Sequence, residues 1–362
     1  MTAKRCLLAI WMGIAAFSLH AQDLLRFIYC SDLHYGIRRE FRGSVVDADV
    51  VNREMLKAFR MLPSSRLPED GGVEAGKLYG EADFVVCTGD IANRMQDGAW
   101  TAERSWKQFE EDWKAAVDVP VYLVPGNHDI SNAIGHPKGL DREPDATSAA
   151  GIFNRAMHPV KERTARTFDY ATDKVRYAFV RDSVRFAFAG MWIDGGVRHW
   201  LDSLMQAGGD MPTFLFTHDP VEAEAKHFMN PNGNHSINAK DRFEDLLNDT
   251  ACVRSVEETP LCNWHELEMF FASHPQIKGY FHGDYNYNEF YTWHGTEGSI
   301  SLPVFRVDSP MKGEISSEDE SRLSFIVVCM DTEKHLLTAR ECLWNQDGKT
   351  GIRWGESVTV AY

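Results

Sequence analysis

The chain lacks the features that mark several large classes of protein. It has no excess of positive charge, since 38 lysines and arginines face 53 aspartates and glutamates and the net charge is −15. An acidic chain repels phosphate backbones, so we expect no electrostatic binding of nucleic acid. It has no internal repeat and no low-complexity segment. No apolar run after the first 21 residues is long enough to cross a bilayer.

The first 21 residues have the pattern of a secretory signal peptide. Lys4 and Arg5 precede a short apolar run, and small Ala21 precedes a polar residue. We therefore predict a leader over residues 1–21, a single domain over residues 22–362, and export to the periplasm or the extracellular space. Cleavage removes two basic residues and no acidic one, which takes the net charge from −15 to −17. An uncleaved anchor is the alternative.

Cysteine is scarce, and its spacing matches no zinc knuckle. Six of the seven cysteines follow the leader. In an exported protein some of these can pair, and Cys252 and Cys262 flank a short loop, so they are the best candidates. Cys30 and Cys87 lie in strand-like runs and are expected to be buried thiols.

Five short apolar runs end abruptly in acidic, histidine or asparagine residues. Runs of this kind, rich in β-branched and aromatic residues, are typical of buried strands. They cover residues 24–30, 84–87, 119–124, 214–216 and 277–281. Ligands in α/β sheets bind beyond the carboxyl ends of the strands. We therefore expect the polar clusters to converge, although they lie far apart in the sequence.

Helical patterns follow two of these runs, at residues 47–62 and 99–117, and this alternation predicts an α/β fold. Hairpin patterns at residues 176–191 and 323–343 indicate antiparallel strands and a second sheet. Two stacked sheets with helices outside would bury this mixed pattern.

Two stretches fit neither the strand nor the helix pattern and are predicted as loop insertions, near residues 130–167 and 220–262. Each directly follows a polar cluster, so we expect both to lie over the site as binding loops or lids. Surface insertions without a role are the alternative. Their histidines, His227 among them, are expected to be solvated, with a substrate contact by one of them as the alternative.

The residues at the strand ends have the chemistry of a metal site. Carboxylate, imidazole and amide oxygen together form a ligand set for divalent transition metals. Two cations about 3.5–4 Å apart can clamp a phosphate and activate a water for in-line attack. Asp32 and His34 stand two residues apart, which would put them on one side of an extended segment. The candidates are Asp32, His34, Asp90, Asn127, His128 and His218.

This ordered series resembles the calcineurin-like metallophosphoesterase superfamily. The matching motifs are Asp32-x-His34, Gly89-Asp90, Gly126-Asn127-His128-Asp129 and His218. The resemblance implies a four-layer αββα sandwich, in which two mixed β-sheets are flanked by helices. It also implies two divalent metal ions, which could be Mn, Fe, Zn or Mg.

The resemblance also implies a role for each metal-facing residue. Asp32 and His34 would bind the first metal, and Asp90 would bridge both metals. Asn127 and His218 would bind the second metal.

A further group of residues is expected to face the substrate. By the resemblance, His128 would stabilise charge on the phosphate, and Asp129 would orient His128. Arg94 is a candidate phosphate contact, and a surface position is its alternative. Tyr285 begins an aromatic-rich segment that could stack on a sugar or base, with burial in the core as the alternative. His282 is a candidate contact beside it.

The last motif departs from the family pattern. The family has Gly-His-x-His where this chain has Gly283-Asp284-Tyr285-Asn286. Asp284 would then stand at the second metal and Asn286 at the first, with oxygen ligands that shift the preference toward Mn or Mg. In a second possible register, His282 and Asp284 form the pair. In an extended strand all three side chains would point the same way.

The function that follows is metal-dependent hydrolysis of a phosphomonoester or phosphodiester by a metal-activated water. The expected partner is a small phosphorylated substrate, without nucleic acid and without a membrane anchor after cleavage. A catalytically degenerate secreted binding protein is one alternative, suggested by the altered last motif. Hydrolysis of a pyrophosphate bond on the same metal core is another.

Overall fold

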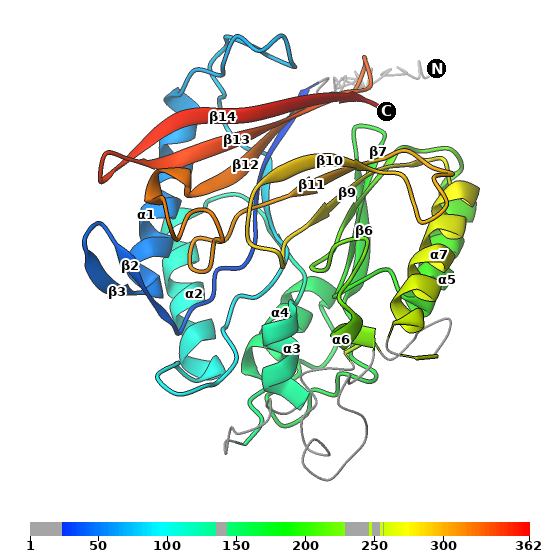
Figure 1. Ribbon diagram of the computed structural model, residues 1–362, viewed down its shortest axis with the longest axis horizontal. Helices are drawn as coiled ribbons and strands as arrows, with labels where there is room; N and C mark the ends of the chain where they lie inside the picture. Colours follow the sequence, from blue (N-terminus) through cyan, green and yellow to red (C-terminus); the bar gives the residue numbers. More distant parts are fainter. Residues whose placement is uncertain (1–23, 135–142, 229–245, 248–253, 256) are drawn as a thin grey trace, which may run out of the picture.

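The computed structural model describes residues 24–134, 143–228, 246–247, 254–255 and 257–362. In this part of the chain two six-stranded mixed sheets lie face to face (Figure 1). The first sheet has the order β14-β13-β12-β1-β4-β5, with strands β14 Lys349–Ala361, β13 Leu336–Gln346, β12 Ser324–Asp331, β1 Leu24–Cys30, β4 Phe84–Cys87 and β5 Val121–Leu123. The second has the order β10-β11-β9-β8-β7-β6, with strands β10 Glu289–Trp293, β11 Leu302–Arg306, β9 Ile277–His282, β8 Thr213–Phe216, β7 Val184–Ala189 and β6 Arg176–Arg181.

Aromatic rings fill the space between the two sheets. Phe27 of β1 stacks on Phe84 of β4 with ring centroids 5.0 Å apart. From the second sheet, Phe186, Phe216 and Phe281 meet Phe27 edge-on at 5.8 to 6.1 Å. All five side chains are buried, and full burial of each phenylalanine stabilises the fold by about 1.5–3 kcal/mol. This layer holds the strand ends of both sheets in fixed positions.

Helices cover the outer faces of both sheets. On the first sheet, α1 (Ala48–Met61) and α2 (Ala102–Ala116) bury apolar side chains, and Phe59 of α1 meets Phe325 of β12 with ring centroids 4.7 Å apart. On the second sheet, α5 (Gly195–Gly208) and α7 (Glu258–Ser273) share an apolar cluster with β8 and β9 (Figure 1). The predicted four-layer αββα sandwich is therefore confirmed.

The remaining elements are short. They are the hairpin β2 Arg38–Phe41 and β3 Ser44–Asp47, the helices α3 Asn127–Ile134, α4 Thr147–Met157 and α6 Ala225–Phe228, and the 3-10 turns η1 Leu62–Ser64 and η2 Glu320–Arg322.

The stretch predicted as a loop insertion near residues 130–167 instead contains most of α3 and all of α4. Gly151 is one residue of this stretch that packs against a neighbouring helix. It lies inside α4, where a Cβ atom would come within 2.2 Å of the Trp106 ring of α2. The glycine therefore permits close helix packing and does not mark a loop. In the second predicted insertion, near residues 220–262, α6 and the start of α7 are helical, and much of the rest lies outside the described residues.

The predicted hairpins are present, but the one at the end of the chain belongs to the first sheet. There β12 pairs antiparallel with β1, and β13 and a further strand, β14, extend the sheet. The hairpin β6–β7 lies in the second sheet. Among the cysteines, Cys30 and Cys87 are buried free thiols, as predicted. Cys262 is disulfide-bonded, and its predicted partner Cys252 lies outside the described residues.

The predicted signal peptide also lies outside the described residues, and the single-domain division stays a prediction. No helix among the described residues is both long and apolar enough to span a membrane.

Candidate metal centre

Backbone hydrogen bonds join the loops that follow the central strands. The amides of Asp32 and His34, after β1, donate to the carbonyls of Gly89 and Asp90, after β4, at 3.0 and 2.8 Å. On the second sheet, the Gly283 amide after β9 donates to the His218 carbonyl after β8 at 3.0 Å. Side chains from all these loops and from the start of α3 therefore meet, as the strand-end argument predicts.

The metal-facing residues have a backbone conformation that the sequence patterns do not reveal. The expectation of extended segments through the first and last motifs is wrong, because these residues have positive φ angles. The values are 57° for Asp32, 42° for His34, 50° for Asp90, 66° for Asp284 and 58° for Asn286. Such left-handed residues cost energy and cluster at functional sites. Here they turn successive side chains into one space.

Two motif glycines allow the loops to approach closely. A Cβ atom on Gly126 would lie 2.2 Å from Asp90 Oδ1, and one on Gly283 would lie 2.2 Å from Asp32 Oδ2. Both distances are far inside van der Waals contact. The glycine before Asn127 and the glycine before Asp284 are therefore required by contacts between loops.

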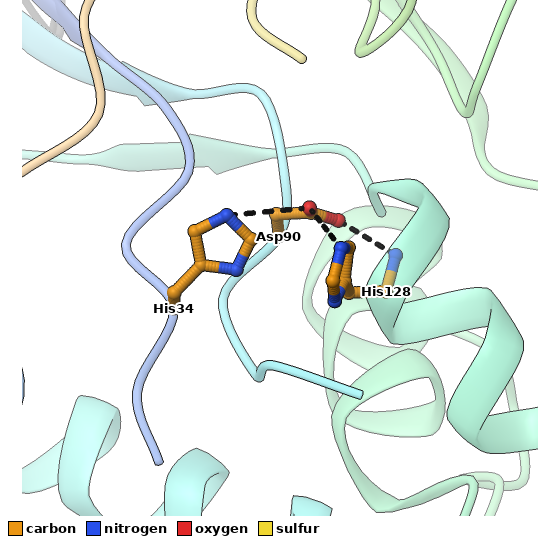
Figure 2. Close-up of side chains that lie close together, drawn as sticks. All are labelled: His34, Asp90 and His128. Atoms are coloured by element: carbon orange, nitrogen blue, oxygen red, sulfur yellow. Dashed lines mark hydrogen bonds and ion pairs between the residues drawn. The ribbon is translucent and has the colours of Figure 1, made fainter. Parts of the chain in front are cut away.

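Asp90 lies between two groups of donors. Its Oδ2 is 3.6 Å from His34 Nε2, and its Oδ1 is 3.6 Å from His218 Nε2 (Figure 2 shows the His34 side). The His128 backbone N–H at the start of α3 donates to Oδ1 at 2.8 Å. A carboxylate with one oxygen directed to each group has the geometry of a bridging ligand.

On the second-metal side, His218 is aimed by the backbone of another loop. Its Nδ1 donates to the Thr88 carbonyl at 2.8 Å, which leaves Nε2 for a metal. Around Nε2 lie Asn127 Oδ1 at 3.0 Å and Asp284 Oδ1 at 3.7 Å. Metal–ligand bonds of about 2.1 Å place the donors of one cation roughly 3.0–3.5 Å apart. The observed spacing fits a shared cation.

On the first-metal side, Asp32 and His34 lie close to Asp90. His34 Nε2 lies 3.7 Å from Asp32 Oδ1. These two atoms and Asn286 Oδ1 are buried and have no hydrogen-bond partner among the described residues. Leaving such atoms unpaired costs free energy, which a bound cation would recover. Asn286 is held by its Nδ2, which donates to the Asp284 carbonyl at 2.6 Å.

His282 is engaged elsewhere. Its Nδ1 lies 2.9 Å from the Gly283 carbonyl, and its Nε2 lies 3.2 Å from the Tyr291 hydroxyl. Burial, and then the charge of Arg306, lower its pKa to about 3. The contacts therefore support the register in which Asp284 and Asn286 are the ligands.

His128 faces the same space as the first-metal donors, with its Nε2 3.7 Å from Asp90 Oδ2 (Figure 2). The backbone N–H of Arg94 donates to His128 Nδ1 at 3.0 Å. A neutral imidazole carries one proton, so we assign it to Nε2. We expected Asp129 to orient His128, but its carboxylate accepts backbone N–H groups of Ile91, Ala92 and Gly126 at 3.0 to 3.2 Å. Asp129 ties two loops together, and the Arg94 amide contacts the imidazole.

The carboxylates around Asp90 attract positive charge. Burial opposes protonation of His218, but Asp90, Asp32 and Asp284 raise its pKa to about 10. Burial, and then the Asp219 carboxylate, raise the pKa of Asp284 to about 6. A divalent cation would replace the proton that this field attracts. The donor set therefore fits a metal by charge as well as by spacing.

Two residues at the site, Asp219 and Lys312, escaped the sequence analysis, and the environment of a third, His227, differs from the expected one. Asp219 lies within 4.8 Å of the ligand atoms of His218 and Asp284, and its Oδ1 is buried without a hydrogen-bond partner among the described residues. Its Oδ2 is 3.0 Å from Nδ1 of His227, which is fully buried and not solvated as expected. The position of Asp219 directly after His218 was an available signal. Lys312, far from every motif, places its Nζ 3.1 Å from His128 Nε2.

Tyr285 lines a cavity of about 640 Å³. The other walls include Trp264, Tyr291, Trp293 and Arg306. Because Tyr285 directly follows Asp284, this cavity begins beside a candidate metal ligand. Part of the predicted aromatic segment therefore lines a cavity instead of packing fully in the core.

The architecture is that of a metallophosphoesterase. Two mixed sheets lie between helices, and Asp, His and Asn side chains at their edge form two groups of candidate donors on either side of Asp90. The family model for calcineurin-like phosphoesterases matches residues 25–284, and the chain belongs to this family.

Two comparisons show what the chain is similar to. It is 26% identical over 171 residues to the glycerophosphodiester phosphodiesterase GpdQ of Enterobacter lignolyticus. The alignment covers 46% of this chain and 53% of GpdQ, so the chain spans about half the length of this curated relative. The crystal structure of a dimetal phosphatase from Danio rerio has a TM-score of 0.53 at 12% identity, covering 93% of this chain and 99% of that chain. It supports the fold.

Proposed function

We propose that the protein hydrolyses a phosphomonoester or phosphodiester with two bound divalent metal ions. The observation that carries the proposal is the position of Asp90, whose two oxygens face separate donor groups at 3.6 Å. The family and the resemblance of half the chain to a phosphodiesterase support the same reaction class.

The residues would divide the work between two metal sites. Asp32, His34, Asn286 and the bridging Asp90 would hold the first cation. Asn127, His218, Asp284 and the same bridge would hold the second. Bound divalent cations supply charge stabilisation at the phosphoryl group and lower the pKa of water. Neither set contains a thiolate, which favours oxygen-preferring metals such as Mn or Mg.

His128 would act on the substrate side. Burial and the Lys312 charge hold its pKa well below the usual range, so the ring is neutral at neutral pH. Its proton at Nε2 points into the site, where it would donate to a phosphoryl oxygen or to the leaving group. The leaving group would extend toward the aromatic cavity beside Tyr285.

The test is turnover of an aryl phosphate and a bis-aryl phosphate by purified protein loaded in turn with Mn, Mg, Zn and Fe. We expect metal-dependent release of the aryl alcohol that a chelator abolishes. His128→Ala should lower kcat by about 10²–10⁴-fold without changing metal content. His199→Ala, on the exposed surface of α5, is the matched control.

Full occupancy of both metal sites without turnover of any ester would refute hydrolysis. Binding of phosphate that survives His128→Ala would then favour the degenerate binding protein. Turnover of a nucleotide sugar alone would favour the pyrophosphate reaction.

We also propose that the protein is exported after cleavage near Ala21. Amino-terminal sequencing of the protein from a culture supernatant or periplasmic extract tests this, and an intact Met1 in those fractions would contradict it.

A further inference from the structure

Lys312 lies on the segment between β11 and β12 and reaches the catalytic side of the metal centre. Its Nζ is 3.1 Å from Nε2 of His128. The Lys312 amide donates to Ser309 Oγ at 2.9 Å, and the same hydroxyl donates to the Asp32 carbonyl at 2.8 Å. The serine therefore fixes the lysine to the loop that carries the first-metal ligands.

The segment is also anchored from outside. Arg39 of β2 is buried and donates to the carbonyls of Pro310 and Ser316 at 2.7 and 2.8 Å. These two carbonyls stand on either side of Lys312. The ammonium group is therefore held in place before any ligand arrives. A charge that is already in position can bind an anion with little reorganisation of the protein.

The contact between Lys312 and His128 joins two hydrogen-bond donors. The Arg94 amide occupies His128 Nδ1, so the ring proton is on Nε2, and that proton faces the ammonium group. Two donors at 3.1 Å repel unless an acceptor lies between or beside them. Among the described residues no carboxylate forms an ion pair with Lys312. A bound ligand oxygen would supply an acceptor to both groups.

An anionic oxygen fits this position. Burial lowers the pKa of Lys312 to about 8, with the carboxylate of Asp90 opposing the shift, so the amine is mostly charged at neutral pH. The carboxylates of Asp32, Asp90 and Asp284 face the metal sites. These three carboxylates would offset most of the charge of two divalent cations. The ammonium group of Lys312, beside His128, would therefore be available to a negatively charged substrate.

We propose that Lys312 and His128 together bind non-bridging oxygens of a dianionic phosphoryl group, and that Lys312 thereby selects phosphomonoesters over phosphodiesters. The inference rests on the proposed function, since it names the substrate class of that site. A monoester phosphate carries a second negative charge near neutral pH, because its second pKa is about 6, whereas a diester carries one charge. A fixed ammonium group therefore attracts the monoester more strongly.

Calorimetric titration of manganese-loaded protein tests the inference without turnover. The ligands are inorganic phosphate, at about pH 7.5 where it is mostly dianionic, and dimethyl phosphate, a monoanionic diester. Lys312→Met should weaken phosphate binding by about tenfold or more, and dimethyl phosphate binding by less than about threefold. Lys312→Arg should retain much of the phosphate affinity. Lys349→Met, on the exposed start of β14, removes the same charge and should change neither.

Turnover supplies a second comparison. In Lys312→Met, kcat/KM should fall about tenfold more for an aryl phosphate than for a bis-aryl phosphate. Metal content should match the wild type in every variant. Phosphate affinity within twofold of the wild type, or equal losses for both anions, would overturn the role of Lys312. If the wild type turns over neither ester while Lys312→Met still loses phosphate selectively, the proposed hydrolysis fails and the anion site stands.

Discussion

Gly126 is a position where the loops of the candidate metal centre leave almost no room for a side chain. A Cβ atom there would lie 2.2 Å from Asp90 Oδ1, 2.4 Å from the Asp90 amide nitrogen and 2.7 Å from His218 Cε1. Non-bonded atoms prefer about 3.5 Å, so Gly126→Ala must displace one of these loops by about 1 Å. Overpacking of this kind costs about 1–3 kcal/mol in the free energy of unfolding.

The same displacement acts on the metals. Ligand distances must hold to within about 0.2 Å, and both Asp90 and His218 are ligands in the proposed centre. We therefore expect Gly126→Ala to weaken manganese binding at least tenfold, comparable with the loss of an orienting contact. The assays are thermal unfolding with and without manganese and elemental analysis after gel filtration. The variant should unfold at a lower temperature and gain less from added metal.

Gly351→Ala is the matched control. It lies in β14, and its nearest neighbour for a new Cβ atom is Gln346 Cβ at 3.9 Å, an ordinary contact. It should leave the unfolding temperature and metal content unchanged. If Gly126→Ala also binds both metals with wild-type affinity and unfolds within about 1 °C of the wild type, the convergence of the loops on Asp90 is wrong.

Three further predictions follow from the site and its surroundings. Asn286→His restores the imidazole of the family pattern and should tighten zinc binding at the first site at least tenfold in a competition titration; equal affinity would mean that residue 286 does not face that metal. Asp219→Asn should weaken the second metal about 10–100-fold in the same assay, whereas an unchanged affinity would leave Asp219 only as the partner of His227. Burial opposes the charge of Glu268, but hydrogen bonds from Ser299 and Thr296 lower its pKa to about 2 from 4.5. The stability from this lowered pKa is present above pH 4.5 and is lost as the pH falls toward 2. In Glu268→Gln, the free energy of unfolding measured in urea should therefore fall less steeply with decreasing pH than in the wild type. An identical slope would contradict the assignment.

Most of the candidate metal ligands could be named from the sequence because each motif is local. A buried strand such as β1 and the two or three polar residues after it are contiguous in the chain, so Asp32 and His34 are visible without the fold. The series of motifs also identified the family and its four-layer architecture. Gly151 shows the limit of local patterns, since its helix packing against Trp106 depends on a contact between two helices.

The direction in which the candidate ligand side chains point was decided by the tertiary structure. Left-handed φ angles at Asp284 and Asn286, and the engagement of His282 by Tyr291, favour the register in which Asp284 and Asn286 are the candidate ligands. No periodicity encodes those angles, because they are imposed by loops that pack against each other.

What the sequence alone determined is the family and the order of the motifs that carry the candidate ligands, because strand, turn and candidate ligand are neighbours in the chain. What only the tertiary structure decided is the set of groups around those ligands. The Asp219–His227 pair forms because the loop after β8 folds back on itself. Lys312 meets His128 across 184 positions of sequence, held there by Ser309. Contacts of this range depend on how the two sheets stack, so they leave no signal in a local pattern.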